Sequence, residues 1–367
     1  MSDESGLDKH SVWRSTDQGR NEGKVTTSVP SAAVRKMRHV EACLGHPVQY
    51  DSRTTGFEKF DLPYVALPET DLSQIDTRTN FLGRPLRAPV LIGAMTGGTE
   101  LAATINRNLA VAADHLGLGL MLGSQRIMVD DATARSSFEV RKYAADALLV
   151  GNLGLAQLNS GYTAAQARLA VELVGADALA FHTNPLQEAM QSGGDGNFRS
   201  LVSRLAEVVD AVPFPVLLKE VGHGIGAVTA GRLGDVALAA VDVAGAGGTS
   251  WSRVEQYVAH GEVRHHELAE WGIPTMQALC EVKQVMPRMP LIASGGIRSG
   301  VDAAKAIALG ASVVAVALPL LEPATRSPEA VIGWLERFLW ELRVAMHCAG
   351  CANLAELSAV GRLQPRF

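Results

Sequence analysis

The segment from Leu291 to Leu318, LIASGGIRSGVDAAKAIALGASVVAVAL, constrains the fold of this chain more than any other. A short apolar run ends at the pair Gly295-Gly296, a segment with helical period follows from Val301 to Leu309, and a β-branched run comes next. This order is typical of the last quarter of a (β/α)8 barrel, where phosphate binds after the seventh and eighth strands. Glycines allow the backbone to approach an anion, and the following helix N-terminus attracts it. The segment therefore predicts a phosphate site, and the alternative is a tight turn without a ligand.

Short apolar runs alternate with amphipathic segments along the rest of the chain. Segments such as Leu101–Leu116 and Ala164–Val174 carry apolar residues near a 3.6-residue period. This alternation predicts an all-parallel sheet covered by helices, and eight strands close into a barrel. We therefore expect an α/β fold, a single-domain (β/α)8 TIM barrel over residues 34–367, preceded by an N-terminal extension, a disordered tail over residues 1–33. The expected strands are Val90–Ala94, Leu118–Leu122, Ala147–Val150, Ala178–Phe181, Pro215–Leu218, Ala239–Val243, Pro290–Ala293 and Ser312–Val316.

Composition excludes several classes of protein. The 367 residues are 47% hydrophobic and 19% charged, which is enough apolar surface for a buried barrel and excludes a mainly disordered chain. A net charge of −5 gives no basic footprint for nucleic acid. No apolar run reaches the roughly 18 residues of a membrane span. The N-terminus carries Asp3, Glu4 and Asp8 instead of a hydrophobic signal, so we expect a cytoplasmic protein.

Polar residues or glycines follow almost every expected strand, which is where the chemistry of such barrels lies. Lys219 stands at one of these ends, and three roles are open to it: a Schiff-base nucleophile, a structural ion-pair partner, or a cation beside an anionic cofactor. The predicted phosphate site favours the third role, with a flavin whose reduced ring is negative at its N1–C2 carbonyl edge. Ser124 and Asn152 are candidate partners of that ring, with hydrogen bonds inside the barrel top as the alternative. The small Ala317 leaves room for a phosphate.

His182, Asn184, Gln187 and Glu188 lie within seven residues after the fourth expected strand. A single carboxylate, Glu188, leaves room around Mg²⁺ for diphosphate oxygens and waters, although an isolated loop carboxylate is commonly solvated. His182 has a second interpretation as a hydrogen-bonded barrel histidine. The cluster contains no pair of carboxylates, no Ser–His–Asp arrangement and no thiolate, so hydrolysis by a side-chain nucleophile is not favoured.

A set of basic residues completes the candidate site. Arg35, Lys36, Arg38 and His39 crowd one short helical segment, and Arg126 follows the second expected strand. Arginine offers two parallel hydrogen bonds to phosphate, and lysine offers a point charge. Charge alone favours a solvated helix face for the first four residues, whereas a diphosphate site would use all five.

Taken together, these motifs resemble type 2 isopentenyl-diphosphate isomerase, the flavin-dependent form. The resemblance runs from Arg35 to the end of the eighth strand, and HTNPLQE with KEVG is specific to this family among flavin barrels. Ala244 stands where the family has a flavin-contacting serine, so one side-chain hydrogen bond to the flavin is expected to be absent. The matching blocks are RKMRH at 35–39, AMTGG at 94–98, GSQR at 123–126, HTNPLQE at 182–188, KEVGHG at 219–224, GAGGTSW at 245–251 and ASGGIRSG at 293–300.

The resemblance implies interconversion of isopentenyl and dimethylallyl diphosphate with FMN, NADPH as reductant and Mg²⁺, in a homo-oligomer that is often an octamer. It implies Gln187, His182 and Lys219 as catalytic residues and Glu188 as the metal ligand. The FMN contacts that it implies are Ala94, Met95, Thr96, Ser124, Asn152, Lys219, Thr249, Gly296, Ile297, Arg298, Ala317 and Leu318. The substrate contacts that it implies are Arg35, Lys36, Ser124, Gln125, Arg126, His182, Asn184 and Gln187.

This reaction adds a proton to one carbon of an alkene and removes one from another. No side-chain acid–base pair is evident in the sequence, so reduced flavin is the expected proton carrier, and the diphosphate supplies binding energy that positions the alkene. Two rivals remain open. A hydroxy-acid oxidase would share the phosphate and lysine sites but needs a His or Tyr base and an arginine for a carboxylate, which HTNPLQE does not provide. The crowded polar strand ends argue against the other rival, a non-catalytic phosphate-binding barrel.

Overall fold

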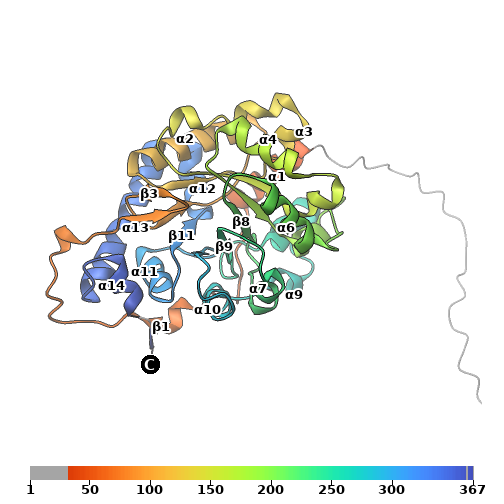
Figure 1. The fold of residues 1–367 in the computed structure, drawn as a ribbon. Helices are drawn as coiled ribbons and strands as arrows, with labels where there is room; N and C mark the ends of the chain where they lie inside the picture. The colour runs from red at the N-terminus through yellow and green to blue at the C-terminus, as the bar shows by residue number, and fades with distance from the viewer. Residues whose placement is uncertain (1–31, 361–362, 367) are drawn as a thin grey trace, which may run out of the picture.

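A closed barrel of eight parallel strands forms the centre of the molecule (Figure 1). The structure is a computed structural model that describes residues 32–360 and 363–366, so most of the tail expected over residues 1–33 lies outside the described residues. The strands follow one another around the barrel in chain order, and pairing of β9 with β10 and of β11 with β4 closes the ring. The barrel strands are β4 Val90–Ile92, β5 Gly119–Met121, β6 Leu149–Gly154, β7 Ala178–His182, β8 Val216–Lys219, β9 Ala240–Asp242, β10 Leu291–Ala293 and β11 Val313–Val316.

All eight strands overlap the runs expected from the sequence, which confirms the (β/α)8 barrel. Strands β6, β7 and β8 extend further than expected, because their backbones continue to pair past Phe181. As a result Asn152, His182 and Lys219 belong to strands and not to loops. Their side chains therefore project from rigid backbone at the rim of the barrel.

Helices cover the outside of the barrel, and short elements complete the ends. The two-stranded pairs are β1 Phe60–Asp61 with β12 Gln364–Pro365, and β2 Thr79–Phe81 with β3 Arg84–Leu86. The α-helices are α1 Ala32–Gly45, α2 Glu100–Leu116, α3 Arg126–Asp130, α4 Ala164–Val174, α5 Pro185–Met190, α6 Leu201–Ala211, α7 Ala227–Leu233, α8 Trp251–His260, α9 His266–Ala269, α10 Thr275–Val285, α11 Gly300–Ala308, α12 Leu318–Arg326, α13 Pro328–Cys348 and α14 Leu354–Ala359. Short 3₁₀ helices lie at Phe57–Lys59, Leu72–Gln74, Ala132–Phe138, Arg141–Tyr143 and Leu155–Ser160.

Side chains alternate between the inside and the outside of the barrel with the two-residue period of a strand. In β4, Leu91 packs with the interior cluster, whereas Val90 and Ile92 face the helices. Phe81 and Leu86, from the β2–β3 hairpin, belong to the interior cluster. This hairpin directly precedes β4 in the chain, so it closes the amino-terminal end of the barrel. The opposite end, where the strands finish, is left for a site.

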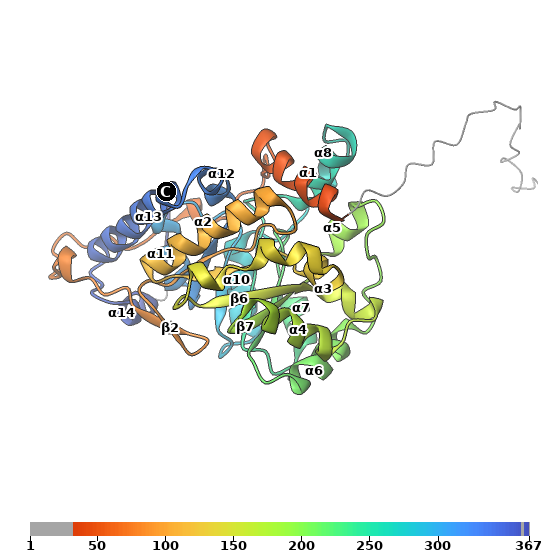
Figure 2. The same ribbon diagram turned by 90° about the horizontal axis from the view of Figure 1, so that it is seen from above.

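Helix α1 lies beside α8 at that opposite end (Figure 2). It begins at Ala32, two residues before the expected boundary. The segment after α1 is fixed to the barrel by backbone bonds from Tyr50 N to Gly248 O and from Ser250 N to Val48 O. The buried Arg253 of α8 adds ion pairs with Asp51 and with Glu270 at 2.9 Å. These contacts hold α1 over the carboxyl ends of the strands.

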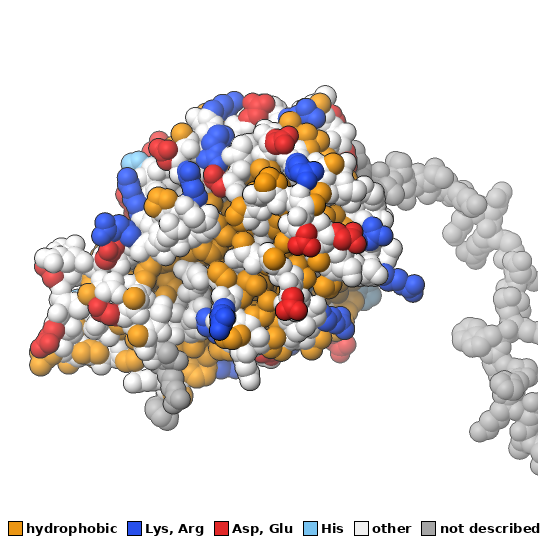
Figure 3. Space-filling view, in the orientation of Figure 1, with side chains coloured by type: hydrophobic (Ala, Val, Ile, Leu, Met, Phe, Trp, Pro, Cys, Tyr) orange, Lys and Arg blue, Asp and Glu red, His pale blue; other side chains and the backbone are white. Residues whose placement is uncertain are grey.

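The surface agrees with the low net charge. Figure 3 shows acidic and basic side chains interspersed on one face, without a broad area of either sign. Within the described part of the chain, no helix combines the length and the hydrophobicity needed to cross a bilayer.

The contact between α11 and α13 depends on the absence of a side chain at Gly300. A Cβ there would lie 2.2 Å from Leu342 N and 2.3 Å from Phe338 O, both backbone atoms of α13. We predict that Gly300→Ala destabilises the protein by about 1–3 kcal/mol, because α13 must move away. Gly333, in the second turn of α13, is exposed, and a Cβ there would have no neighbouring atom within 4 Å. Gly333→Ala is the matched control and should raise stability by about 0.5–1 kcal/mol. Thermal unfolding of both variants checks the opposite signs.

Candidate active site

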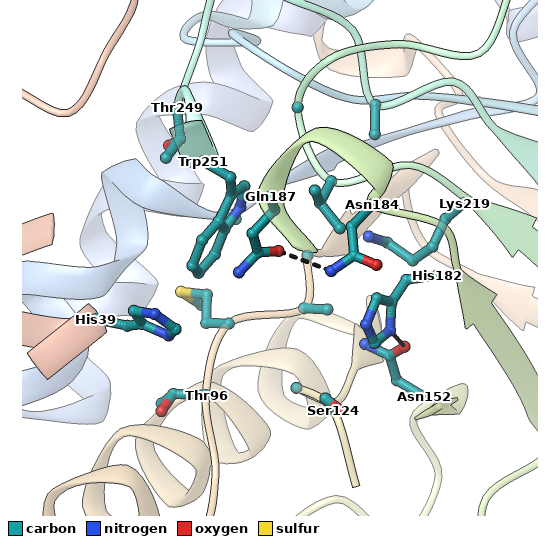
Figure 4. Close-up of a pocket in the computed structure, with 18 of the residues that line it drawn as sticks. His39, Thr96, Ser124, Asn152, His182, Asn184, Gln187, Lys219, Thr249 and Trp251 are labelled. Carbon is teal, nitrogen blue, oxygen red and sulfur yellow. Dashed lines mark hydrogen bonds between the residues drawn. The ribbon is translucent and has the colours of Figure 1, made fainter. Parts of the chain in front are cut away.

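The carboxyl ends of the barrel strands open into one cavity of about 550 Å³. Small-molecule sites measure roughly 300–1,000 Å³, so this volume fits a cofactor together with a small substrate. Helices α1, α3, α5, α8 and α12 also contribute to the wall, part of which is drawn in Figure 4. Every residue expected to contact FMN, substrate or metal lines this cavity, with the exception of Gln125. The basic residues expected at the site do not all reach the cavity. His39 lines it, whereas Arg38 is exposed on α1 and does not.

Gln125 lies beneath the cavity floor. Its fully buried side chain accepts a hydrogen bond from Asn152 N at 2.6 Å and donates one to Ala170 O at 2.8 Å. Both ends of the amide are therefore occupied inside the protein, and the substrate contact expected from the GSQR motif is not open to this side chain. Gln125 instead holds the end of β5 against β6.

The loops after β9 and β10 form a cradle of glycines. Gly295 and Gly296 have φ angles of 92° and 74°, which L side chains rarely adopt. A Cβ on Gly295 would lie 2.0 Å from Gly245 O, and one on Gly296 would lie 2.7 Å from Gly247 O. The N–H groups of Gly296 and Ile297 have no acceptor among the residues that the structure describes. Helix α11 begins just beyond them, so unpaired donors and a helix N-terminus meet where a phosphate would bind.

Hydrogen bonds determine the tautomer of His182. Asn152 donates from Nδ2 to Leu122 O at 2.9 Å, which turns its Oδ1 toward His182 Nδ1, also at 2.9 Å. Because an amide oxygen can only accept, His182 carries its proton on Nδ1 and leaves Nε2 as an acceptor. Burial lowers the pKa of His182 to about 3, and the Lys219 and Lys36 cations add to this shift. His182 is therefore neutral before an anion binds.

Lys219 and Asp242 form a buried pair of groups on neighbouring strands. The two residues are register partners in β8 and β9, and Lys219 Nζ donates to Glu220 O at 2.6 Å. Burial lowers the pKa of Lys219, opposed by the Asp242 and Glu220 carboxylates, and burial raises the pKa of Asp242. Asp242 accepts from Ser294 Oγ at 2.6 Å. Asp242 was not predicted as a site residue, and an acidic residue inside the apolar run Ala239–Val243 was the available signal.

A hydrogen-bonded chain fixes Gln187. Asn184 Nδ2 donates to Gln187 Oε1 at 2.9 Å, and Gln187 Nε2 donates to Glu255 Oε1 at 2.8 Å. His39 Nε2 lies 3.0 Å from the same Glu255 oxygen, and the His39 ring meets Trp251 edge to face with centroids 5.3 Å apart. Figure 4 shows His39 of α1, Gln187 of α5 and Trp251 of α8 converging on the cavity. Glu255 was missed from the sequence, although it lies one helical turn after Trp251 of the GAGGTSW motif.

The basic residues gather at the side of the cavity formed by α1 and α3. Lys36 Nζ donates to Ser124 O and lies 5.2 Å from the centroid of the Phe138 ring. Burial lowers the pKa of Lys36 to about 7, and the charge of Arg35 contributes to the shift. Arg126 Nη1 contacts Asp195 Oδ2 at 2.6 Å. This side of the cavity therefore offers cations to a second anion, separate from the glycine cradle.

Glu188 lies buried at the base of this basic region. Its Oε1 accepts from Asn184 Nδ2 at 3.0 Å, and its Oε2 accepts from Asp195 N at 2.6 Å. Across the described ranges, no cluster of three or more His, Cys, Asp or Glu side chains could hold a metal by itself. A single carboxylate fits Mg²⁺, which commonly takes one or two protein ligands and completes its shell with substrate oxygens and water.

Comparison with known proteins agrees with this geometry. The model of the FMN-dependent dehydrogenase family matches residues 157–362. A mandelate oxidase crystal structure with (S)-2-phenylpropionate superimposes with a TM-score of 0.64 at 19% identity, covering 91% of this chain and 98% of that one. A lactate oxidase structure from Pediococcus acidilactici gives a TM-score of 0.63 at 15% identity, covering 91% and 94%. At these identities the likeness to the oxidases concerns the fold alone. Fold, glycine cradle and strand-end lysine define a barrel of the FMN-dependent dehydrogenase class.

Closer relatives carry one shared name, isopentenyl-diphosphate delta-isomerase. The protein of that name from Mycolicibacterium gilvum is 59% identical over 337 residues, covering 91% of this chain and 98% of the relative. The one from Deinococcus radiodurans is 57% identical over 323 residues, covering 88% and 96%. The chain belongs to the isopentenyl-diphosphate delta-isomerase family.

The lowered pKa of Lys36 generates a prediction about anion binding. A bound diphosphate raises this pKa, so above pH 7 the free protein must take up a proton in order to bind. We predict that affinity for inorganic pyrophosphate falls as the pH rises through about 7, by up to about tenfold per pH unit. The Lys36→Arg variant stays charged at this position, so it should lack the part of the pH dependence that comes from Lys36. The part that comes from the titration of pyrophosphate itself is the same for both proteins. Calorimetry from pH 6 to 9 checks this, and parallel profiles for the two proteins contradict it.

Proposed function

We propose that this protein interconverts isopentenyl diphosphate and dimethylallyl diphosphate, with FMN as cofactor, NADPH as its reductant and Mg²⁺ bound with the substrate. The observation that carries the proposal is the division of one cavity into two anion-binding regions. The glycine cradle lies on one side, and Arg35, Lys36 and Arg126 lie on the other. Neutral polar side chains, among them Gln187, occupy the space between. Membership of the isomerase family supports the same assignment.

The residues present fit FMN. Unpaired N–H groups at Gly296 and Ile297 suit its phosphate, and the Lys219 cation suits the edge of the ring that becomes negative on reduction. Reduced FMN, when bound, supplies the proton that the alkene gains and accepts the one that it loses. The further residues proposed to hold it are Ala94, Met95, Thr96, Ser124, Asn152, Thr249, Arg298, Ala317 and Leu318.

The basic region is proposed to hold the diphosphate. Arg126 provides hydrogen bonds in a fixed plane, and Lys36 provides a charge in a poorly solvated position. Glu188 is the proposed magnesium ligand, with diphosphate oxygens and waters as the other ligands. Because the diphosphate is remote from the reacting carbons, its binding energy can position the alkene without changing the groups that react.

Gln187 and His182 are the proposed catalytic residues of the protein itself, together with Lys219. The amide of Gln187 has one orientation, because Asn184 Nδ2 can only donate to it and Glu255 can only accept from it. One N–H of Gln187 remains for the substrate or the cofactor. His182 presents the bare Nε2 of a neutral ring, so it can take a proton or a hydrogen bond when the diphosphate arrives.

We also propose that the protein is cytoplasmic and forms a homo-oligomer, an octamer on the pattern of the resemblance. Its only proposed partner besides its own copies is a small diphosphate. Light scattering of the purified protein tests the number of subunits.

Turnover should require reduced flavin but should not consume a molecule of reductant for each product. The two diphosphates have the same oxidation state, so we predict that anaerobic turnover of isopentenyl diphosphate proceeds for many cycles after a single reduction of the flavin. The measurement follows dimethylallyl diphosphate and NADPH together under argon. One NADPH lost for each product formed would make the protein an oxidoreductase, the first of the two rivals.

Lys219 should act on the flavin itself. We predict that Lys219→Ala weakens FMN binding by about tenfold or more and lowers the midpoint potential of any flavin retained, because a cation beside the reduced ring is lost. Lys59→Ala is the control, since Lys59 is exposed and does not line the cavity. Flavin fluorescence titration and spectroelectrochemistry check both variants. Equal behaviour of the two would remove the cofactor role of Lys219.

A further inference from the structure

The loop after α5 wraps closely around Glu188. Asp195 donates its backbone N–H to Glu188 Oε2 at 2.6 Å, and Gln191 Nε2 lies 3.5 Å from the same oxygen. At Gly194 a Cβ would meet Glu188 O at 2.1 Å and Glu188 Oε2 at 2.9 Å. The loop therefore follows the carboxylate at a distance that only glycine permits. This places the backbone of Asp195, whose side chain carries a second carboxylate, in contact with the proposed magnesium ligand.

The side chain of Asp195 reaches the basic region. Its Oδ2 accepts from Arg126 Nη1 at 2.6 Å and from Gln157 Nε2 at 3.3 Å. Arg126 Nε lies 3.8 Å from Asp130 Oδ2, and its remaining nitrogen, Nη2, has no partner within the described part of the chain. Arg126 lines the cavity, and the Arg126 and Asp195 side chains are 41% and 25% exposed, so the pair remains accessible to solvent. One residue thus joins the proposed metal ligand to the proposed diphosphate ligand.

We propose that Asp195 is a specificity-determining residue that makes diphosphate binding depend on Mg²⁺. The proposal rests on the magnesium–diphosphate site proposed above. Mg²⁺ neutralises two negative charges of a diphosphate. The carboxylates of Glu188 on α5 and of Asp195 on the loop that follows it repel the metal-free anion and attract the metal in its complex. Asp195 also neutralises Arg126 in part, so that this arginine alone does not capture metal-free anions such as inorganic phosphate.

The charge of Asp195 can be separated from its structural role. The bond that anchors the loop to Glu188 comes from the backbone N–H, which Asn retains at this position. Asn also retains a side-chain oxygen that can accept from Arg126. Asp195→Asn therefore removes the negative charge and keeps both hydrogen bonds, to Glu188 and from Arg126, that hold the loop in place.

The test measures equilibrium binding to the oxidised holoenzyme, which does not turn over. Inorganic pyrophosphate is titrated by calorimetry, once with a chelator and once with excess Mg²⁺. For Asp195→Asn we expect metal-free pyrophosphate to bind more tightly and its magnesium complex to bind more weakly than in the parent. The ratio of the two affinities should fall by roughly tenfold, as expected for one charge near the ligand. Glu188→Gln should lower the same ratio, and the exposed Asp210→Asn on α6 should leave it unchanged.

Two results would overturn the proposal. An unchanged ratio would show that the charge of Asp195 does not act on the metal complex. A parallel loss of affinity with and without Mg²⁺ would show that Asp195 only holds Arg126 in place. Flavin content and circular dichroism establish that the variant is folded, and Asp195→Ser is a second variant without the charge. This measurement involves no turnover. An absence of isomerase activity would therefore contradict the proposed function, and the binding measurement would still decide the role of Asp195.

Discussion

Closure of the ring of parallel strands is the constraint on which the rest of the structure depends. Because every strand runs in the same direction, all the carboxyl ends meet at one rim. The register of pairing then orders the residues there: His182 pairs with Lys219, and Lys219 pairs with Asp242. A histidine, a lysine and an acid that are far apart in the chain become neighbours on backbone that cannot move independently. Their altered pKa values follow from this crowding and burial.

Two of the cations for the second anion, Arg35 and Lys36, come from outside this ring. Helix α1 precedes the barrel in sequence, and it is held over the rim by the backbone bonds of Tyr50 and by the buried Arg253. Lys36 therefore reaches Ser124 O from a separate layer of structure. A rigid rim thus holds the proposed cofactor region, and an added helix holds part of the proposed substrate region. The two regions can change independently within the same fold.

The sequence was sufficient to predict the barrel, because parallel strands buried on both faces form apolar runs and their polar ends are conspicuous. Of the site residues that it predicted, all but Gln125 line the cavity. It did not reveal Asp242, because one acid in an apolar run does not show what lies beside it. Glu255 and Asp195 were missed for a related reason, since their importance comes from contacts with Gln187 and Arg126 that only the folded chain creates. Ser124 and Arg126 line the cavity, but Gln125 between them does not. Adjacent side chains point in different directions, and a sequence motif does not show those directions.

The β2–β3 hairpin, whose Phe81 and Leu86 fill the amino-terminal end of the barrel, has a kinetic consequence. With that end closed, the cavity lies at the carboxyl ends of the strands, where α1 and α8 also lie. On the function proposed above, the reductant of the flavin and the diphosphate would use this same end of the barrel. They would then bind in turn, with reduction of the flavin before the diphosphate occupies the cavity and release of each product before any further reduction.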